Sequence, residues 1–297
     1  MPAVLFLTVV VVWGLTWFAI HLQLGTTPDV VSIFWRFASA SILLWMLLLA
    51  TKSYRPGPWR RHIGYAGLGL CLFSVNFLFL YAAGRHISSG LESVVFSLAT
   101  VLNVFNQFLF RRIRPSARVL IGAILGAGGV ALLFADQLIG PHVDALGILL
   151  ALGGTYSFSL GNLLSTRITA DGTTLANAMV RAMSWGAACL GLLVIASGDH
   201  FAVSTNKFYL GGLAYLSIFG TIIGFFTYLT LVARIGPSRA AYVTVITPVV
   251  ALTMSTFFEH YHWTGLAIPA TILILLGNLI IFLPSRRRAV THVSLVK

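Results

Sequence analysis

Residues 31–50 read VSIFWRFASASILLWMLLLA, a stretch long and apolar enough to cross a membrane as one helix. Arg36 lies inside this stretch, although a charged side chain in hydrocarbon costs about 2.5–3.5 kcal/mol on insertion scales. The stretch therefore predicts a membrane-spanning helix that carries its charge for a structural or a functional reason.

The whole chain has the composition of a membrane protein. Of its 297 residues 58% are hydrophobic and 9% are charged, and so little polar surface cannot cover a soluble globule. Apolar runs separated by charged residues, proline or glycine predict ten helices in an all-α integral membrane protein. Their limits are 2–21, 31–50, 63–83, 88–110, 117–135, 145–166, 174–196, 208–233, 239–258 and 263–283.

The charges report orientation. Placing the loops alternately on two sides puts most bases on one side, with the single acid Asp171, and only Arg85 and Lys207 on the other. The basic side holds Lys52, Arg55, Arg60, Arg61, Arg111, Arg112, Arg114, Arg118, Arg167, Arg234, Arg239, Arg286, Arg287, Arg288 and Lys297. The other side holds the acids Asp29, Asp136, Asp144, Asp199 and Glu259. The positive-inside rule puts both termini in the cytoplasm, so the net charge of +12 does not indicate nucleic-acid binding.

The two halves of the chain show weak internal similarity. A shift of 148 residues sets Thr100 on Pro248, and a shift of 145 earlier in the chain sets Arg36 on Arg181. Residues 1–140 and 141–297 each hold five predicted spans, and an odd number makes the halves insert with opposite orientation. Inverted repeats around a central cavity are common in secondary transporters, with the site near the bilayer midplane.

Several segments resemble a known family. They are WG at 13–14 with Thr16, FWRF at 34–37, SSGLESVVFSLAT at 88–100, IGAILGAGGVALLF at 121–134 and RIGPSRAAYVTVITPVVALTMSTFFE at 234–259. On these segments the whole chain resembles an EamA-type member of the drug/metabolite transporter superfamily. The resemblance implies a five-plus-five inverted repeat and a cavity lined mainly by spans one, three, four, six, eight and nine. It also implies movement of small metabolites across a bacterial-type inner membrane, often the export of amino acids.

The resemblance has one departure. The first half reads FRRIR at 110–114, where the family usually ends span four with Gly-Glu, whereas Glu259 follows that pattern. The role of the first-half glutamate in relatives therefore cannot be transferred to this chain.

Polar side chains form a stripe on two predicted helices. At about 100° per residue, one arc of span four holds Glu92, Thr100, Asn103, Asn106 and Gln107, and a similar arc of span nine holds Thr244, Thr247, Pro248, Ser255 and Glu259. Such a stripe faces another helix or a water-filled cavity, because lipid would leave its polar groups unsatisfied. Its occurrence in both halves favours a cavity. Pro248 frees a carbonyl within its helix, which a protein interior can satisfy.

Aromatic and polar residues within other spans extend the candidate substrate site. Trp13, Trp17 and His21 share one face of span one, and the two tryptophans lie too deep to be interface anchors. They form either a simple packing face or the aromatic wall of a pocket. Further candidates are Asn76, Tyr81, Tyr156, Tyr228 and Tyr242, of which Tyr81 lies near a span end and could equally be an anchor.

Three charged residues fall inside spans. Glu92 is the one carboxylate among them, and such residues are typical proton relays, so we expect a role in proton coupling or in binding a substrate amine. The alternative is an ion pair with Arg36. Because Arg36 and Arg181 correspond in the repeat, we expect both to be structural or gating charges that hold carbonyls or a helix end, in preference to direct substrate binding.

These patterns together predict a secondary transporter that moves an amino acid or a related zwitterionic or amphipathic compound by alternating access, with export favoured. The alternatives are a membrane-embedded lipid-modifying enzyme and an exporter of lipophilic drugs or cations. An enzyme is disfavoured because the seven acids are scattered and no DxxD or HExxH motif is present.

No cofactor and no metal is expected, since the two histidines of EHYH at 259–262 rarely form a site alone. The expected partners are a small-molecule substrate and the lipid bilayer. Gly122, Gly126 and Gly129 form a small-residue packing face that could also serve a homodimer, so the chain is expected to be a monomer or a homodimer.

Overall fold

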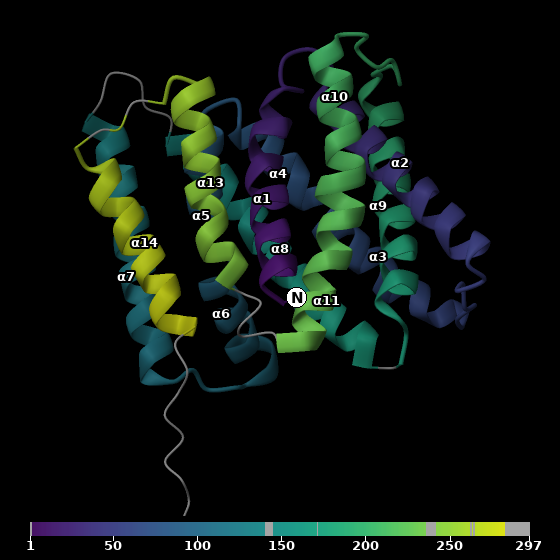
Figure 1. The fold of residues 1–297 in the computed structure, drawn as a ribbon, viewed down its shortest axis with the longest axis horizontal. Coiled ribbons are helices and arrows are strands. Elements are labelled where there is room, and N and C mark those ends of the chain that lie inside the picture. The colour runs from purple at the N-terminus through teal and green to yellow at the C-terminus, as the bar shows by residue number, and fades with distance from the viewer. Residues whose placement is uncertain are drawn as a thin grey trace, which may run out of the picture.

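The computed structural model describes residues 2–139, 145–170, 172–235, 242–261, 263 and 265–282. Within these residues every regular element is a helix (Figure 1). The helices of the first half are α1 (Pro2–His21), α2 (Asp29–Ala50), η1 (Trp59–Arg61), α3 (His62–Leu70), η2 (Cys71–Val75), α4 (Asn76–Ala83), α5 (Ser89–Phe96), α6 (Ala99–Arg111) and α7 (Ala117–Ile139). Those of the second half are α8 (Ala145–Ala170), α9 (Leu175–Ser197), α10 (Lys207–Tyr215), η3 (Leu216–Ile223), α11 (Gly224–Ile235), α13 (Tyr242–Phe258) and α14 (Ala267–Phe282).

Each of the ten predicted spans contains helix in the structure. By length and composition, seven helical stretches of the described residues are able to cross a membrane: Ala3–His21, Asp29–Ala50, Trp59–Ala83, Ser89–Arg111, Ala145–Ser165, Leu175–Ser197 and Lys207–Tyr228. Three shorter apolar helices cover Ala117–Leu132, Val243–Phe258 and Ala267–Ile281. The chain is therefore an all-helical membrane protein, as its composition predicts.

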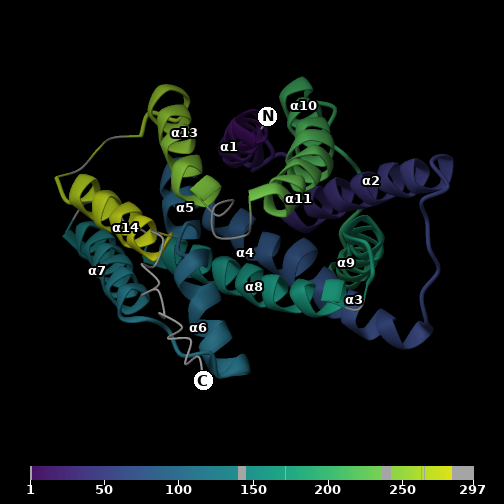
Figure 2. The same ribbon diagram turned by 60° about the horizontal axis from the view of Figure 1, so that its bottom comes forward.

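The helices of the two halves pack together in one bundle. Figure 2 shows α7 and α14 paired at one edge, and α2, α9 and α3 at the opposite edge. Between these edges, α1 packs against α13 and α11, while α8 packs against α6 and α4.

The glycine face of α7 packs against α14 of the same chain. A methyl group added at Gly122 would lie 2.5 Å from the Gly277 carbonyl oxygen, and one added at Gly129 would lie 2.7 Å from the Ala270 carbonyl oxygen. Only glycine allows two helix backbones to approach so closely. The predicted packing face is thus occupied within one chain, where the sequence had left open its use in a homodimer.

Three of the predicted spans are interrupted. Span four breaks at Ser97–Leu98 between α5 and α6, while spans three and eight contain the π-helical segments η2 and η3. The two π segments begin at Cys71 and Leu216, which the same shift of 145 residues that aligns Arg36 with Arg181 brings together. Such segments widen a helix locally and often occur at functional sites.

Candidate functional site

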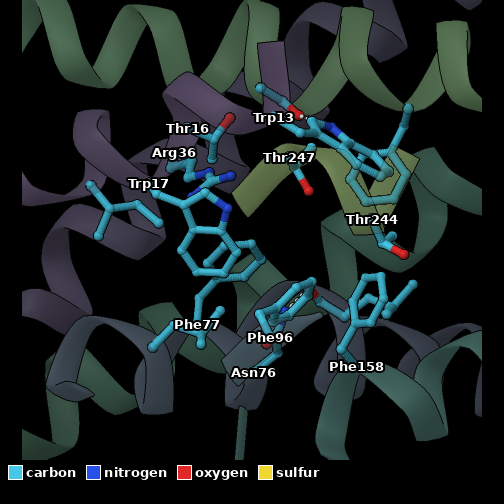
Figure 3. A pocket seen from close by; sticks show the side chains of 15 residues that line it. Trp13, Thr16, Trp17, Arg36, Asn76, Phe77, Phe96, Phe158, Thr244 and Thr247 are labelled. Atoms are coloured by element: carbon cyan, nitrogen blue, oxygen red, sulfur yellow. Dashed lines mark hydrogen bonds between the residues drawn. The ribbon is translucent and has the colours of Figure 1, made fainter. Parts of the chain in front are cut away.

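A cavity lies in the middle of the bundle, between helices of both halves (Figure 3). Its aromatic lining consists of Trp13, Trp17, Phe77, Phe96, Phe158 and Phe225. Its polar lining consists of Thr16, Arg36, Asn76, Thr244 and Thr247. The cavity volume is about 70 Å³, which leaves room for a few water molecules or a small chemical group.

The aromatic walls are held by contacts with one another and with the backbone. The Trp13 indole N–H donates to the Gly220 carbonyl at 3.2 Å, and its ring lies 5.0 Å from the ring of Tyr228. The Trp17 ring meets Phe96 edge to face, with 5.0 Å between the ring centroids. Trp13 and Trp17, for which the sequence left open simple packing or a pocket wall, line the cavity in the structure.

Two polar side chains of the cavity have unsatisfied atoms. Arg36 is only 2% exposed, and its guanidinium lies 4.2 Å from the Phe77 ring centroid. Its Nε donates to the Thr221 hydroxyl at 3.5 Å, but its Nη1 has no hydrogen-bond partner. The Asn76 side-chain nitrogen donates to the Leu72 carbonyl at 3.5 Å, while its Oδ1 has no partner.

These unsatisfied atoms define what the cavity can bind. A buried polar atom without a partner costs about 1–3 kcal/mol, so a ligand that satisfies it gains binding free energy. A guanidinium is suited to a carboxylate, and an amide oxygen accepts from an ammonium group. The two side chains therefore offer complementary groups to a zwitterion, and the aromatic walls suit an apolar side chain.

Arg181 has different surroundings from Arg36, its counterpart in the sequence repeat. Its Nη1 donates to the Asn177 carbonyl at 3.1 Å, and its Nη2 donates to the Arg55 carbonyl. The second bond joins α9 to the segment that follows α2, and Arg181 is not among the residues that line the cavity. The geometry favours a structural role for Arg181, whereas Arg36 faces the cavity with an unpaired nitrogen.

The predicted polar stripe of span four does not line the cavity. Thr100 donates to Asn278 of α14, and Asn103 accepts from Asn162 of α8 at 3.4 Å. Gln107 is partly exposed on α6 and is not among the lining residues. The predicted stripe depends on one continuous helix across span four, but the helix is broken at Ser97–Leu98. Thr100 and Asn103 therefore bond neighbouring helices and do not line the cavity.

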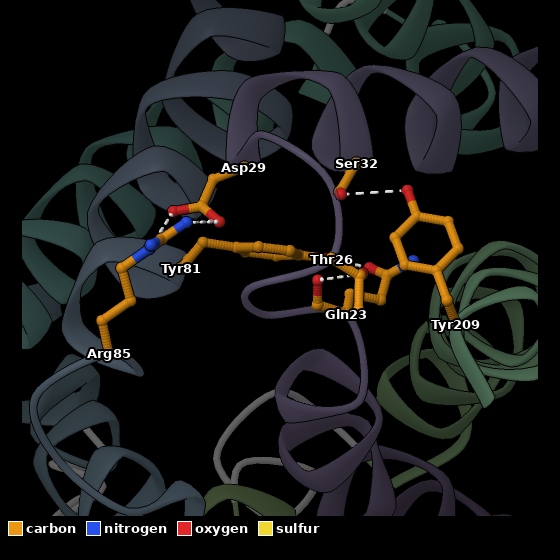
Figure 4. A network of polar contacts seen from close by, with 7 residues as sticks. All are labelled: Gln23, Thr26, Asp29, Ser32, Tyr81, Arg85 and Tyr209. Carbon is orange, nitrogen blue, oxygen red and sulfur yellow. Dashed lines mark hydrogen bonds and ion pairs between the residues drawn. The ribbon is translucent and has the colours of Figure 1, made fainter. Parts of the chain in front are cut away.

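Tyr81 belongs to a polar network beyond the cavity (Figure 4). Its hydroxyl donates to the Gln23 side-chain oxygen, and both residues are fully buried. Nearby, Arg85 donates two hydrogen bonds of 2.8 Å to Asp29, and this carboxylate raises the pKa of the Arg85 guanidinium. The network ties the segment between α1 and α2 to the end of α4.

The remaining predicted substrate-binding residues are dispersed. Thr244 lines the cavity, whereas Tyr228 lies behind Trp13 and Pro248 is buried within α13 outside the lining. Tyr156 is 37% exposed on α8. Tyr242 begins α13, and its side chain lies outside the described part of the structure.

Glu92 is fully buried one helical turn beyond the cavity, and its partner is His21. The His21 Nε2 lies 3.7 Å from a Glu92 oxygen, and His21 Nδ1 lies 3.8 Å from an oxygen of Glu259. The structure thus places His21 beside Glu92, where the sequence suggested Arg36 as the alternative. Among the described residues there is no group of three metal-binding side chains with suitable geometry.

None of the phenylalanines that line the cavity was predicted from the sequence. Phe77, Phe96, Phe158 and Phe225 line the cavity, and nothing in the sequence pattern distinguishes them from the other phenylalanines among the 21 of the chain. Thr247 was detectable, since it lies on the polar arc of span nine.

Comparison with known proteins identifies the family. The model of the EamA-like transporter family matches residues 1–135 and 145–283. A relative from Escherichia coli (strain K12), named "Probable amino-acid metabolite efflux pump", is 29% identical over 283 residues, which cover 92% of each chain. An "Uncharacterized inner membrane transporter" of the same strain is 26% identical and covers 90% of this chain and 88% of its own length.

A solved crystal structure gives a TM-score of 0.67, with 18% identity over 94% of this chain and 95% of that chain, so the likeness is one of fold. The family match spans both halves of the sequence. The chain therefore belongs to the EamA-like transporter family of the drug/metabolite transporter superfamily, and it is a transporter rather than an enzyme.

Proposed function

We propose that this protein is a secondary transporter that exports an amino acid, or a closely related zwitterionic metabolite, across the inner membrane by alternating access. The observation that carries the proposal is the cavity between the two halves, where the unpaired Arg36 Nη1 and Asn76 Oδ1 lie among aromatic walls. A carboxylate and an ammonium group on one small ligand satisfy both atoms.

The layout of the helices supports an inverted repeat of ten membrane spans, with residues 1–140 and 141–297 as its halves. The contacts of α1 with α13 and α11 match those of α8 with α6 and α4, and the π segments η2 and η3 occupy equivalent places. Both segments contribute to the cavity lining, through Leu72 and Gly220. Two local helix distortions flanking a central site suit a rocking motion of one half against the other.

The charge distribution supports the orientation in the membrane, and the names of the relatives support the direction of transport and the location. With both termini in the cytoplasm, the basic loops lie on the cytoplasmic side. One relative is named as an efflux pump for amino-acid metabolites and another as an inner membrane transporter. We infer export across the inner membrane, with lipid as the surrounding partner and one chain or a pair of chains as the functional unit.

Counterflow in proteoliposomes tests the proposal. Vesicles are preloaded with one unlabelled compound at a time, and uptake of the same radiolabelled compound is followed. The panel contains the twenty amino acids, the amines that lack their carboxylates, and the lipophilic cation tetraphenylphosphonium. We expect uptake of at least one amino acid and none of its amine. Uptake of tetraphenylphosphonium or of the amine in preference to every amino acid would replace the proposal with export of lipophilic cations.

A further inference from the structure

We propose that His21, Glu92 and Glu259 form a binding site for a proton taken from the external side, and that the bound proton holds the external ends of α1, α5 and α13 together. The inference rests on the proposed function, because it assigns the coupling ion of that transporter. The sequence pointed to Glu92 alone, and the structure adds His21 and Glu259 as its neighbours in the proposed site.

The three side chains join three helices from both halves of the chain. His21 is the last residue of α1, Glu92 lies in the first turn of α5 and Glu259 follows α13. The His21 ring lies between the carboxylates, with its nitrogens 3.7 Å from Glu92 and 3.8 Å from Glu259. Gly84 packs against the same place, since a methyl group there would lie 3.1 Å from His21 Nε2.

The two carboxylates differ in their hydrogen bonding. One Glu259 oxygen accepts from the Ser89 backbone N–H at 2.9 Å and from the Ser255 hydroxyl at 3.0 Å, so it also caps the start of α5. Glu92 is completely buried and neither of its oxygens has a hydrogen-bond partner. A buried carboxylate without such partners is costly in its charged form, and its remaining compensation comes from the His21 ring.

The ion-pair distances of 3.7 and 3.8 Å favour one proton more than a neutral imidazole and two ionised carboxylates carry. A neutral imidazole has one N–H group and one nitrogen that can only accept, yet both His21 nitrogens face carboxylate oxygens. In either neutral tautomer the accepting nitrogen faces a carboxylate oxygen, unless the ring or one of the two carboxyl groups carries an additional proton. When that proton is lost to external water, an unprotonated His21 nitrogen faces a carboxylate oxygen. The two groups then repel each other, and the contact between the three helices is weakened.

The site stacks directly on the substrate cavity. Along α1, His21 lies one turn beyond Trp17, and along α5, Glu92 lies one turn before Phe96. Trp17 and Phe96 contact each other and form the wall between the site and the cavity. Closure of the external end on proton binding would return an exporter to its inward-facing state, as proton-for-substrate exchange requires.

Other titratable groups on the neighbouring elements include His86, between α4 and α5, and His260, next to Glu259. Among the described residues, the charged groups that act on Glu92 are His21 and Glu259, and those that act on His21 are Glu92 and Glu259. Groups with separate contacts are Asp29 with Arg85, Tyr81 with Gln23, Tyr209 with Ser32, Tyr215 with the Val12 carbonyl, Tyr228 with Trp13 and Tyr261 with Trp263.

Accessibility of the cavity from outside, measured at several pH values, tests the site. Thr16, in the cavity wall, is replaced by cysteine in a chain whose Cys71 and Cys189 are alanine. A membrane-impermeant methanethiosulfonate is applied externally between pH 6 and pH 9. Its rate is normalised to that at Thr205→Cys, an exposed position, which corrects for the reactivity of the thiol itself.

We expect the normalised rate of modification at Thr16→Cys to rise about tenfold from pH 6 to pH 9. This is the largest change in the open fraction that a proton can cause when it binds about tenfold more tightly to the closed state than to the open state. Glu92→Gln mimics the protonated carboxyl and should keep the rate low at every pH, whereas Asp199→Asn, an external carboxylate bonded to Ser197, should respond like the parent. A parent rate independent of pH, or an unchanged response in Glu92→Gln, would overturn the proposal.

A second variant keeps the test decisive if Glu92→Gln does not fold. His21→Gln removes the ring that links the carboxylates, so its rate at pH 6 should already approach the parent's rate at pH 9. A parent-like low rate and pH response in His21→Gln would contradict the inference. The measurement uses no substrate, so its failure is distinguishable from a failure of amino-acid counterflow.

Discussion

Replacing Arg36 with methionine should remove recognition of the substrate carboxylate while leaving the cavity closed to lipid. Methionine keeps the apolar contact with Phe77, which lies 4.2 Å from the guanidinium, but offers no donor to the cavity. A hydrogen bond to a charged group contributes about 1.5–3 kcal/mol, and 1.4 kcal/mol is a tenfold change in affinity. The KM for the transported amino acid should therefore rise about 10- to 150-fold.

Arg181→Met is the matched control. It removes the arginine that the proposed repeat aligns with Arg36, but one whose guanidinium donates to the carbonyls of Asn177 and Arg55. We expect less folded protein and a lower melting temperature, with an unchanged KM for the protein that does fold. Counterflow of the amino acid identified by the panel, in vesicles matched for protein content, measures both variants.

The result that refutes the reasoning is an unchanged KM in Arg36→Met. Equal losses of affinity in the two arginine variants would refute it as well, since the effect would then follow from weakened packing. A loss of folding in Arg36→Met, rescued by Arg36→Lys with normal KM, would return Arg36 to the structural role that the sequence repeat suggested.

Three further outcomes follow from individual contacts. Asn76→Leu should weaken amino-acid binding about 2- to 13-fold, the effect of one hydrogen bond of 0.5–1.5 kcal/mol; an equal loss for an analogue without the amine would contradict it. Gly122→Ala should lower the free energy of unfolding by about 1–3 kcal/mol through overpacking, and lower the melting temperature followed by tryptophan fluorescence. Gly128→Ala, whose added methyl meets open space, should leave both unchanged, and equal shifts in the two variants would count against the α7–α14 packing. Asp29→Asn breaks a pair in which Arg85 is 47% exposed and should cost at most about 1 kcal/mol by the same assay, so a larger loss would show that the bridge is a principal support.

The positions of the helices were predictable because hydrocarbon imposes the same local demand on every span. A run of about 20 apolar residues is visible without knowledge of its neighbours, and loop charges follow the side of the membrane. The glycine face of α7 was predictable for a similar reason, since close backbone approach leaves small residues at helical spacing.

The contents of the cavity were less predictable because they depend on how each helix is rotated against the others. Thr100 and Asn103 were assigned to the cavity on the assumption of one continuous helix, and the break at Ser97–Leu98 separates them from Glu92. The partner of Glu92 illustrates the same limit. His21 and Glu259 are 71 residues before and 167 residues after it in the chain, and no local pattern joins the three.

Protection of a cavity cysteine by substrate tests the central claim most directly. Thr247→Cys, in the chain with Cys71 and Cys189 replaced by alanine, places a thiol in the cavity wall on the second half. If the substrate binds in the cavity, an impermeant thiol reagent reaches this position from either side of the membrane in turn, and the transported amino acid slows the reaction with a midpoint equal to its KM. Transport that continues with no protection at this position would show that the substrate binds elsewhere.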